Sequence, residues 1–207
     1  MIVHHFTTPI TTPFARKSTQ IYGDLHRFWE KAKIKESAKK PEITGLYRLI
    51  KGYKIMIKIL FVCHGNICRS PMAEYVMKDL VKKANLADQF YIASAATSTE
   101  EIGNPVHRGT RAKLAQAGIA CDDHRARQMT RADYGMYDYI IGMDTENMRN
   151  LNRIFKNDKE NKLYKFLSFA DSDRDIADPW YTGNFDETYT DILEGCEGFL
   201  KYLKIIK

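Results

Sequence analysis

An apolar run that leads directly into a glycine-containing loop and then a helix constrains this chain more than any other feature. Residues 57–62 form a short run of mostly apolar, partly β-branched residues, which is typical of a buried strand. After the loop, residues 70–81 repeat apolar side chains at helical spacing. We expect Ser70 to cap this helix and Pro71 to hold its first position, where the fixed φ of proline fits.

The same alternation of strands and helices continues toward the C-terminal end of the chain. Further strands are predicted at 91–94, 139–142 and 163–167, and helices at 106–117, 145–155 and 185–203. Strands separated by helices indicate βαβ units and a parallel sheet. We therefore predict one α/β domain over residues 56–207.

The first 55 residues have a different character from the rest. They hold 11 basic and 4 acidic side chains, a net charge of +7, whereas residues 56–207 hold 21 and 22, a net charge of −1. Apart from a candidate helix over 20–35, this segment is loop-like, and the globular pattern begins abruptly at Met56. We interpret it as a basic N-terminal extension. It can be a surface anchor, a partner-binding arm or a targeting segment. We favour a simpler interpretation, in which it is not a domain and either adds nothing to function or is an extended reading frame upstream of a natural start at Met56.

Composition excludes several classes of protein. Because the basic charge belongs to the extension, we do not expect the main domain to bind nucleic acid. No stretch approaches 18 consecutive apolar residues and the N-terminus lacks a secretory signal, so we expect no stable membrane insertion. The cysteines show neither a disulfide framework nor a zinc spacing. We expect a cytoplasmic protein without a metal. The cysteines are Cys63, Cys68, Cys121 and Cys196.

The loop Cys-His-Gly-Asn-Ile-Cys-Arg-Ser, residues 63–70, has the residue types of a nucleophile in a phosphate cradle. It precedes a helix, whose unpaired N–H groups and dipole attract an anion and favour a thiolate at Cys63. Gly65 and Asn66 tolerate the left-handed turns that such a cradle needs. Arg69 adds a planar, permanently charged fork for two phosphate oxygens. The serine that ends the loop can donate a hydrogen bond to the sulfur.

The spacing of this cysteine and arginine is by itself a weak signal, because it occurs twice in the chain. Cys121 and Arg127 are separated in the same way. No glycine lies between them and no strand precedes them, and Asp122 and Asp123 occupy the place where a phosphate would have to bind. We interpret this second segment as a surface loop.

Cleavage of a phosphate ester also requires a proton for the leaving oxygen, which a nearby carboxylic acid can supply. Spacing alone does not choose among the four aspartates of the C-terminal region. These are Asp171, Asp173, Asp175 and Asp178.

The segment Val-Cys-His-Gly-Asn-Ile-Cys-Arg-Ser-Pro-Met-Ala-Glu resembles the signature of the low-molecular-weight protein tyrosine phosphatases. The resemblance continues through residues 124–128, Met143-Asp144 with Asn147, and residues 178–181, and it covers about residues 56–207. It implies a small four-stranded parallel sheet of flavodoxin-like topology with helices on both faces. It also implies a protein-tyrosine phosphatase that forms a phosphocysteine and needs no metal or cofactor.

The resemblance assigns roles to individual residues. Cys63 is the expected nucleophile, and the Asp-Pro-Trp-Tyr context makes Asp178 the expected general acid. Cys68 is expected either to pack in the loop or to form a reversible disulfide that protects Cys63 from over-oxidation. The implied phosphate-binding residues are His64, Gly65, Asn66, Ile67, Cys68, Arg69 and Ser70.

Other positions are expected to support the loop or to form the pocket rim. Ser94 and His124 are expected to hold Asn66, and Asp144 either braces Arg69 or the loop or caps a helix. The implied rim residues are Glu101, Trp180 and Tyr181. Trp180 and Tyr181 can flank the pocket mouth or be ordinary core or surface aromatics. Glu101 departs from the pattern of the family, because many relatives carry an aromatic residue near that position.

Three alternative functions remain open. Protein arginine phosphatases resemble this loop but carry Thr where this chain has Ile67. Arsenate reductases of similar fold need closely paired downstream cysteines, whereas Cys121 and Cys196 lie 75 residues apart. The third is a non-enzymatic phosphate-binding module. The expected partner is a tyrosine-phosphorylated protein, and the expected state is a monomer or weak dimer.

Overall fold

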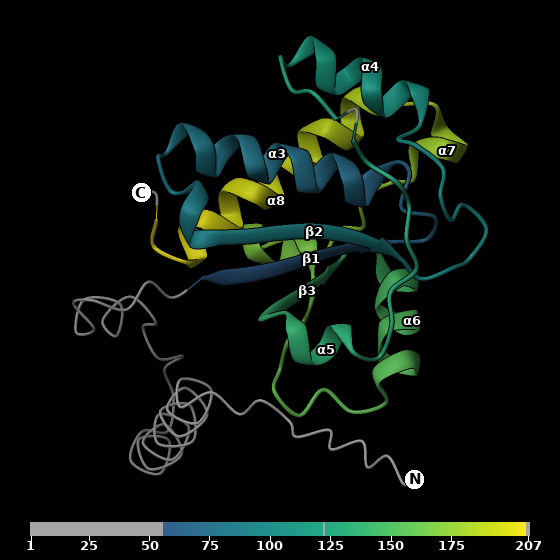
Figure 1. Ribbon diagram of the computed structural model, residues 1–207, viewed down its shortest axis with the longest axis vertical. Helices are drawn as coiled ribbons and strands as arrows, with labels where there is room; N and C mark the ends of the chain where they lie inside the picture. The colour runs from purple at the N-terminus through teal and green to yellow at the C-terminus, as the bar shows by residue number, and fades with distance from the viewer. Residues whose placement is uncertain (1–55, 122, 206–207) are drawn as a thin grey trace, which may run out of the picture. The chain divides into compact units, whose positions relative to one another are not determined.

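The computed structural model describes residues 56–121 and 123–205 (Figure 1). The basic N-terminal extension, with its candidate helix over 20–35, lies outside the described residues, so its interpretation stays a prediction. Among the described residues, no helix has the length and apolar character needed to span a bilayer.

The four predicted strands form a single parallel sheet. They are β1 (Ile57–Cys63), β2 (Phe90–Ala96), β3 (Tyr139–Gly142) and β4 (Leu163–Lys165), in the spatial order β2-β1-β3-β4. The prediction of a four-stranded parallel sheet with flavodoxin-like topology is confirmed. In such sheets ligands bind beyond the carboxyl ends of the strands where the strand order reverses, and β1 ends at that point.

Helices cover both faces of this sheet, as predicted (Figure 1). On one face lie α3 (Arg69–Lys83), α8 (Phe185–Tyr202) and, farther out, α4 (Arg108–Gln116). On the other face lie α5 (Asp133–Met136) and α6 (Thr145–Phe155).

The alternation of side chains along β1 divides the core in two. Ile59, Phe61 and Cys63 belong to the larger cluster, which includes residues of α3 and α8, whereas Leu60 and Val62 belong to the smaller cluster on the opposite face. A one-residue slip of β1 would exchange these two sets. Burial on both faces therefore fixes the strand register, and with it the face to which Cys63 belongs.

The predicted strand at 163–167 is too long. Pairing with β3 ends at Lys165, and η2 (Phe166–Ala170), a 3-10 helix, follows at once. Phe166 and Leu167 are fully buried in the larger core, and the Phe166 ring lies 5.0 Å from the ring of Phe61. An apolar run signals burial, and here that burial continues after the strand has ended. The shorter elements η1 (Ala87–Gln89) and α7 (Pro179–Thr182) complete the described fold.

The predicted start of the first helix is also wrong. Residue Cys68 precedes the first helical residue, Arg69, and makes no side-chain capping bond, so Ser70 and Pro71 fall second and third in α3. The first N–H groups of a helix have no acceptor within it, so proline is tolerated in the first turn. The Ser70 hydroxyl contacts the sulfur of Cys63 instead of capping the helix.

Candidate active site

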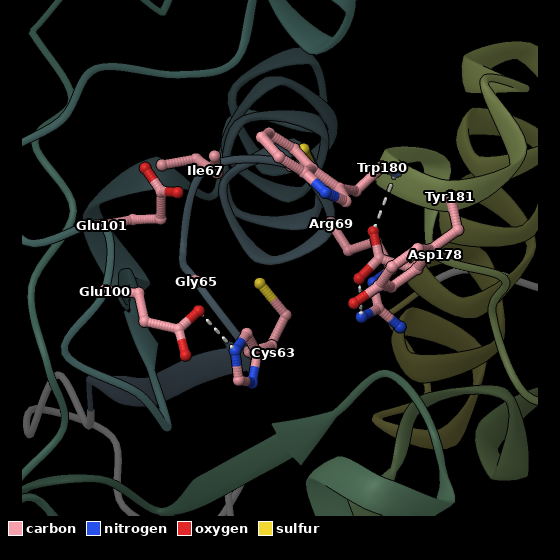
Figure 2. A pocket seen from close by; sticks show the side chains of 11 residues that line it. Cys63, Gly65, Ile67, Arg69, Glu100, Glu101, Asp178, Trp180 and Tyr181 are labelled. Carbon is pink, nitrogen blue, oxygen red and sulfur yellow. Dashed lines mark hydrogen bonds and ion pairs between the residues drawn. The ribbon is translucent and has the colours of Figure 1, made fainter.

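A pocket of about 130 Å³ lies at the carboxyl end of β1 (Figure 2). Its walls come from the loop between β1 and α3, the turn after β2, and the start of α7. Most of the expected phosphate-binding and rim residues line it, together with Glu100, which the sequence did not indicate. The lining residues are Cys63, His64, Gly65, Ile67, Cys68, Arg69, Glu100, Glu101, Asp178, Trp180 and Tyr181.

The sulfur of Cys63 has hydrogen-bonding partners from the loop and from α3. The Asn66 backbone N–H donates to Sγ at 3.3 Å, and the Ser70 hydroxyl oxygen lies 3.0 Å from Sγ. A thiolate accepts such bonds from both groups, and hydrogen bonds to an ionised acceptor are the stronger kind. The geometry therefore suits a cysteine that reacts as a thiolate.

The loop conformation depends on Asn66, whose φ of 58° lies in the left-handed region. Its side-chain amide donates to the hydroxyl oxygens of Ser70 at 2.9 Å and Ser94 at 2.8 Å, and its Oδ1 accepts the Arg127 N–H at 3.1 Å. The His124 ring Nε2 lies 2.8 Å from the Asn66 carbonyl oxygen. The contacts expected for Ser94 and His124 are thus present, and residues distant in sequence hold this strained turn.

A buried carboxylate that the sequence analysis missed extends this network. The Ser94 hydroxyl donates to Glu74 Oε2 at 2.5 Å, and the other Glu74 oxygen pairs with the Lys78 ammonium. Glu74 is 7% exposed and lies on α3 among apolar side chains. An acidic residue within the buried face of a helix is unusual, and this was the signal that could have indicated it.

Arg69 is almost fully buried and contacts two carboxylates. Its Nη1 donates to Asp144 Oδ2 at 2.5 Å and to the Ile176 carbonyl at 3.0 Å, and its Nη2 pairs with Asp178. Burial alone would lower the pKa of Arg69, but the negative groups around it, Cys63 first, raise it. Its Nε has no acceptor within the described residues. A buried donor without an acceptor is costly, and an oxyanion in the pocket would satisfy it.

Asp144 has both of the roles that the sequence left open. One oxygen accepts the Arg69 bond, and the other accepts the N–H of Asn147 at 2.6 Å, which caps α6. The side chain of Asn147 in turn accepts the Met143 N–H at 3.2 Å. The arginine is therefore held by the start of a helix on the opposite face of the sheet.

Asp178 is the one of the four candidate aspartates that lines the pocket. It caps the short helix α7, because its Oδ1 accepts the Trp180 N–H at 3.1 Å, and its Oδ2 pairs with Arg69. Asp175, by contrast, accepts the Thr145 N–H at 3.0 Å, and it is not among the lining residues. The geometry therefore favours the same aspartate as the sequence resemblance.

The pocket rim has two unlike sides, as Figure 2 shows. Trp180 and Tyr181 are 57% and 84% exposed and lie on the side of Asp178. Glu100 and Glu101 lie across the pocket, and Glu100 Oε2 is 3.0 Å from the His64 Nε2. One side therefore presents aromatic rings and the other presents carboxylates.

The interpretation of the second cysteine–arginine segment as a surface loop is only partly correct. Cys121, His124 and Ala126 are buried, whereas Asp123 and Arg125 are exposed. The His124 ring bonds to the backbone of the phosphate loop, residues 63–70, and Ala126 packs in one cluster with Ile67 and Cys68 of that loop. Sequence polarity alone could not reveal this, because the burial comes from a contact with residues about 60 positions earlier.

The remaining cysteines differ from Cys63 in their surroundings. Burial, and then the nearby Cys63 and Asp178, raise the pKa of Cys68 to about 12, so Cys68 is a thiol at neutral pH. Cys121 and Cys196 are buried and do not line the pocket. Within the described ranges, no three or more His, Cys, Asp or Glu side chains are grouped as a metal site.

A family model described as low molecular weight phosphotyrosine protein phosphatase matches residues 58–206. The low molecular weight protein-tyrosine-phosphatase YfkJ of Bacillus subtilis (strain 168) is 46% identical over 149 residues, covering 70% of this chain and 94% of the relative. The low molecular weight phosphotyrosine protein phosphatase of Rattus norvegicus is 42% identical over 148 residues, covering 69% of this chain and 93% of the relative.

Solved structures of phosphatases also match this chain. The crystal structure of YfkJ from Bacillus subtilis has a TM-score of 0.70 at 42% identity and covers 75% of this chain and 98% of its own. The crystal structure of DARP, a Drosophila arginine phosphatase, has a TM-score of 0.67 at 34% identity and covers 72% of this chain and 98% of its own.

Proposed function

The chain belongs to the low molecular weight phosphotyrosine protein phosphatase family, and on that premise we propose that it hydrolyses phosphotyrosine through a phosphocysteine on Cys63. Curated relatives in this family are named protein-tyrosine phosphatases, so the chain is a phosphatase and its substrates are phosphoproteins. The proposal concerns the residues that carry the reaction and the phosphorylated side chain that enters the pocket.

In the first step, the Cys63 thiolate attacks phosphorus and the bond from phosphorus to the tyrosyl oxygen breaks. Asp178 donates its proton to that oxygen, so that tyrosine leaves as a neutral phenol and the phosphoryl group stays on sulfur. The position of Asp178 at the start of α7, on the pocket wall beside Arg69, supports this role.

In the second step, Asp178, now a carboxylate, takes a proton from a water molecule that attacks the phosphocysteine. The sulfur–phosphorus bond breaks, inorganic phosphate forms, and the thiolate is restored. The Ser70 hydroxyl and the Asn66 N–H, both within hydrogen-bonding distance of Sγ, stabilise the sulfur as a leaving group.

The observation that carries this proposal is the buried Arg69 Nε, which has no acceptor within the described residues. Together with Nη2 it forms a fork that can bind two equatorial phosphate oxygens. Nη2 also pairs with Asp178, so phosphate binding would compete for that bond and leave the carboxyl group beside the leaving oxygen. The N–H groups at the start of α3 add donors for the remaining oxygen.

We favour phosphotyrosine over phosphoarginine as the substrate. Ile67 lines the pocket with an apolar surface, and Trp180 and Tyr181 flank its mouth, a combination that suits a phenyl ring. The structural likeness to an arginine phosphatase keeps phosphoarginine as the second candidate. The distant and buried Cys121 and Cys196 do not favour arsenate reduction.

The decisive experiment measures hydrolysis of aryl phosphates of graded leaving-group pKa by the wild type and Asp178→Asn, with a chelator present. We expect the variant to lose about 100-fold or more in kcat for poor leaving groups but about tenfold or less for activated esters. Asp123→Asn, an exposed aspartate outside the pocket, serves as the matched control. Equal losses for all esters would refute the assignment of Asp178 as the acid.

A panel of phosphotyrosine, phosphoserine and phosphoarginine peptides then identifies the substrate. Turnover restricted to phosphotyrosine supports the proposal, whereas turnover restricted to phosphoarginine replaces it with the second candidate. Phosphate binding without any turnover, equal in the wild type and Cys63→Ser, would indicate a non-enzymatic binding module.

A further inference from the structure

From the unlike sides of the pocket rim, we infer that Glu100 and Glu101 form an acidic lip that selects phosphotyrosines next to lysine or arginine in the substrate. The inference rests on the proposed function and names the sequence context that this site accepts. Both carboxylates line the pocket that contains Cys63 and Arg69. They lie across it from Trp180 and Tyr181 (Figure 2).

The acidic lip is attached to the phosphate loop by the backbone. Past the end of β2, the Thr97 N–H donates to the Cys63 carbonyl at 2.9 Å and the Ser98 N–H donates to the His64 carbonyl at 3.0 Å. These bonds continue the pairing between β1 and β2 into the turn that carries the lip. The two carboxylates therefore have a defined place relative to the nucleophile.

Each lip residue also has a side-chain partner that orients it. Glu101 Oε2 accepts from the Asn104 amide at 2.6 Å, and Glu100 Oε2 lies 3.0 Å from the His64 ring nitrogen. Gly65 leaves room for the lip, because a Cβ at that position would lie 3.0 Å from Glu101 Cγ. The His64 and Glu100 side chains are 51% and 69% exposed, so their pairing is weak and the carboxylate stays available to a substrate.

The cationic side chains that line the pocket are too few to neutralise the two carboxylates of the acidic lip. Asp178, Glu100 and Glu101 supply three carboxylates, and Arg69 is the sole lysine or arginine among the lining residues that the structure describes. Arg69 already pairs with Asp144 and Asp178. Its buried Nε has no partner within the described residues, and in the proposed function it binds phosphate rather than the rim carboxylates.

The position of the lip determines which part of a substrate it contacts. A pocket of about 130 Å³ accommodates a phosphate group and part of a ring, so neighbouring residues of the substrate remain at the rim. Adjacent residues lie about 4 Å apart along a chain, well within the Debye length of about 8 Å at physiological salt. A lysine or arginine there is attracted to the lip, and an aspartate or glutamate is repelled.

The test compares peptides that differ only in the residues flanking one phosphotyrosine, which are lysine, alanine or glutamate. We expect kcat/KM for the lysine peptide to exceed that for the glutamate peptide by about tenfold at low salt. The ratio should fall toward one in 0.5 M salt and in the double variant Glu100→Gln, Glu101→Gln. The control, Glu160→Gln with Glu197→Gln, removes the same charge from exposed positions outside the pocket and should keep the wild-type ratio.

Two further measurements separate this inference from the proposed function. Hydrolysis of a small aryl phosphate by the wild type tests the function alone, because such a substrate has no flanking residues. The dissociation constants of the three peptides for Cys63→Ser test the lip without turnover. Activity on the aryl phosphate with equal kcat/KM and equal binding for all three peptides would overturn the acidic lip and leave the proposed function intact.

Discussion

Residues 63–69 and residues 121–127 each place a cysteine and an arginine at the same spacing, yet they have different surroundings. The first segment joins the end of β1 to the start of α3 and lines the pocket with both residues. In the second, Cys121 is buried in the larger core, and the Arg127 guanidinium bonds to Asp133 at 3.3 and 3.2 Å. Equal spacing therefore corresponds to a candidate reactive site in one place and a supporting element in the other.

The difference between the two segments comes from what precedes and follows each cysteine. The loop at 63–69 lies between a buried strand and a helix N-terminus, a position where unpaired N–H groups attract an anion. The second segment lacks that frame and instead contacts the first, since the His124 ring and the Arg127 backbone both bond to Asn66. Paired substitutions in the two segments can test this division of roles.

The largest difference is expected between the two cysteines. Cys63→Ser should lower kcat for an aryl phosphate by more than about 10⁴-fold, because a serine hydroxyl at this site stays protonated. Cys121→Ser should keep kcat within about twofold while lowering the free energy of unfolding by about 1–2 kcal/mol, since it buries a hydroxyl. Steady-state kinetics and urea titration measure the two effects. Comparable loss of kcat in both variants would contradict the assignment.

The two arginines should differ next. Arg69→Lys should lower kcat/KM by about 100-fold or more, because an ammonium group cannot replace the planar fork that we propose binds two phosphate oxygens. Arg127→Lys should change kcat/KM by less than about threefold, since the backbone N–H that bonds to Asn66 is retained. Kinetics with a single aryl phosphate are sufficient. An effect of Arg127→Lys equal to that of Arg69→Lys would place its guanidinium in the reaction.

A smaller effect is expected when the support from the second segment is removed. His124→Ala should lower kcat/KM by about tenfold and weaken competitive inhibition by inorganic phosphate to a similar degree, because the Asn66 carbonyl loses its partner. His124→Gln can still donate a hydrogen bond and should recover part of both losses. Arg125→Ala, at the exposed neighbouring position, is the control. If phosphate inhibition were unchanged in His124→Ala, the ring would have no part in shaping the loop.

The smallest effect is the contribution of Cys68, in the first segment, to the pH dependence of the free energy of unfolding. The pKa of Cys68 is raised to about 12 by burial, so the folded protein keeps this proton when the unfolded chain loses it above about pH 9. The contribution of Cys68 to stability is therefore complete below that pH and is lost as pH rises from about 9 toward 12. Between pH 8 and pH 10, the wild type should lose about 1–2 kcal/mol more than Cys68→Ala.

Urea titrations at the two pH values measure this difference, and Cys68→Ser separates ionisation from side-chain volume, because neither serine nor alanine ionises in this range. The two variants should show the same pH dependence. A wild type that follows the variants would mean that the Cys68 thiolate is tolerated in the folded protein.

Local patterns predicted most of the fold, because strands and helices are set by residues close together in sequence. The strand at 139–142 has the predicted bounds, and the others differ by a few residues at their ends. The errors at Ser70 and Phe166 have one origin. Both residues make tertiary contacts, with Cys63 and Phe61, that replace the cap and the strand predicted from local sequence.

The residues of the candidate site also fall into two groups, those that local sequence predicts and those that only tertiary contacts bring together. The cradle-forming residues from Cys63 to Ser70 are adjacent in sequence, so their chemistry and their position before a helix could be predicted together. Glu74 and the pair of His64 with Glu100 were missed, because their roles exist only after α3 and the turn after β2 pack beside the loop. No spacing rule describes such contacts.

The sequence by itself determined the alternation of strands and helices and the phosphate loop, because neighbouring residues along the chain set backbone conformation there. Only the tertiary structure determined which carboxylates pair with Arg69. Asp144 and Asp178 lie 75 and 109 residues away from it along the chain, and the packing of α6 and α7 brings both to one guanidinium. Contacts over such separations depend on how the whole core packs, and that information is not contained in any local segment.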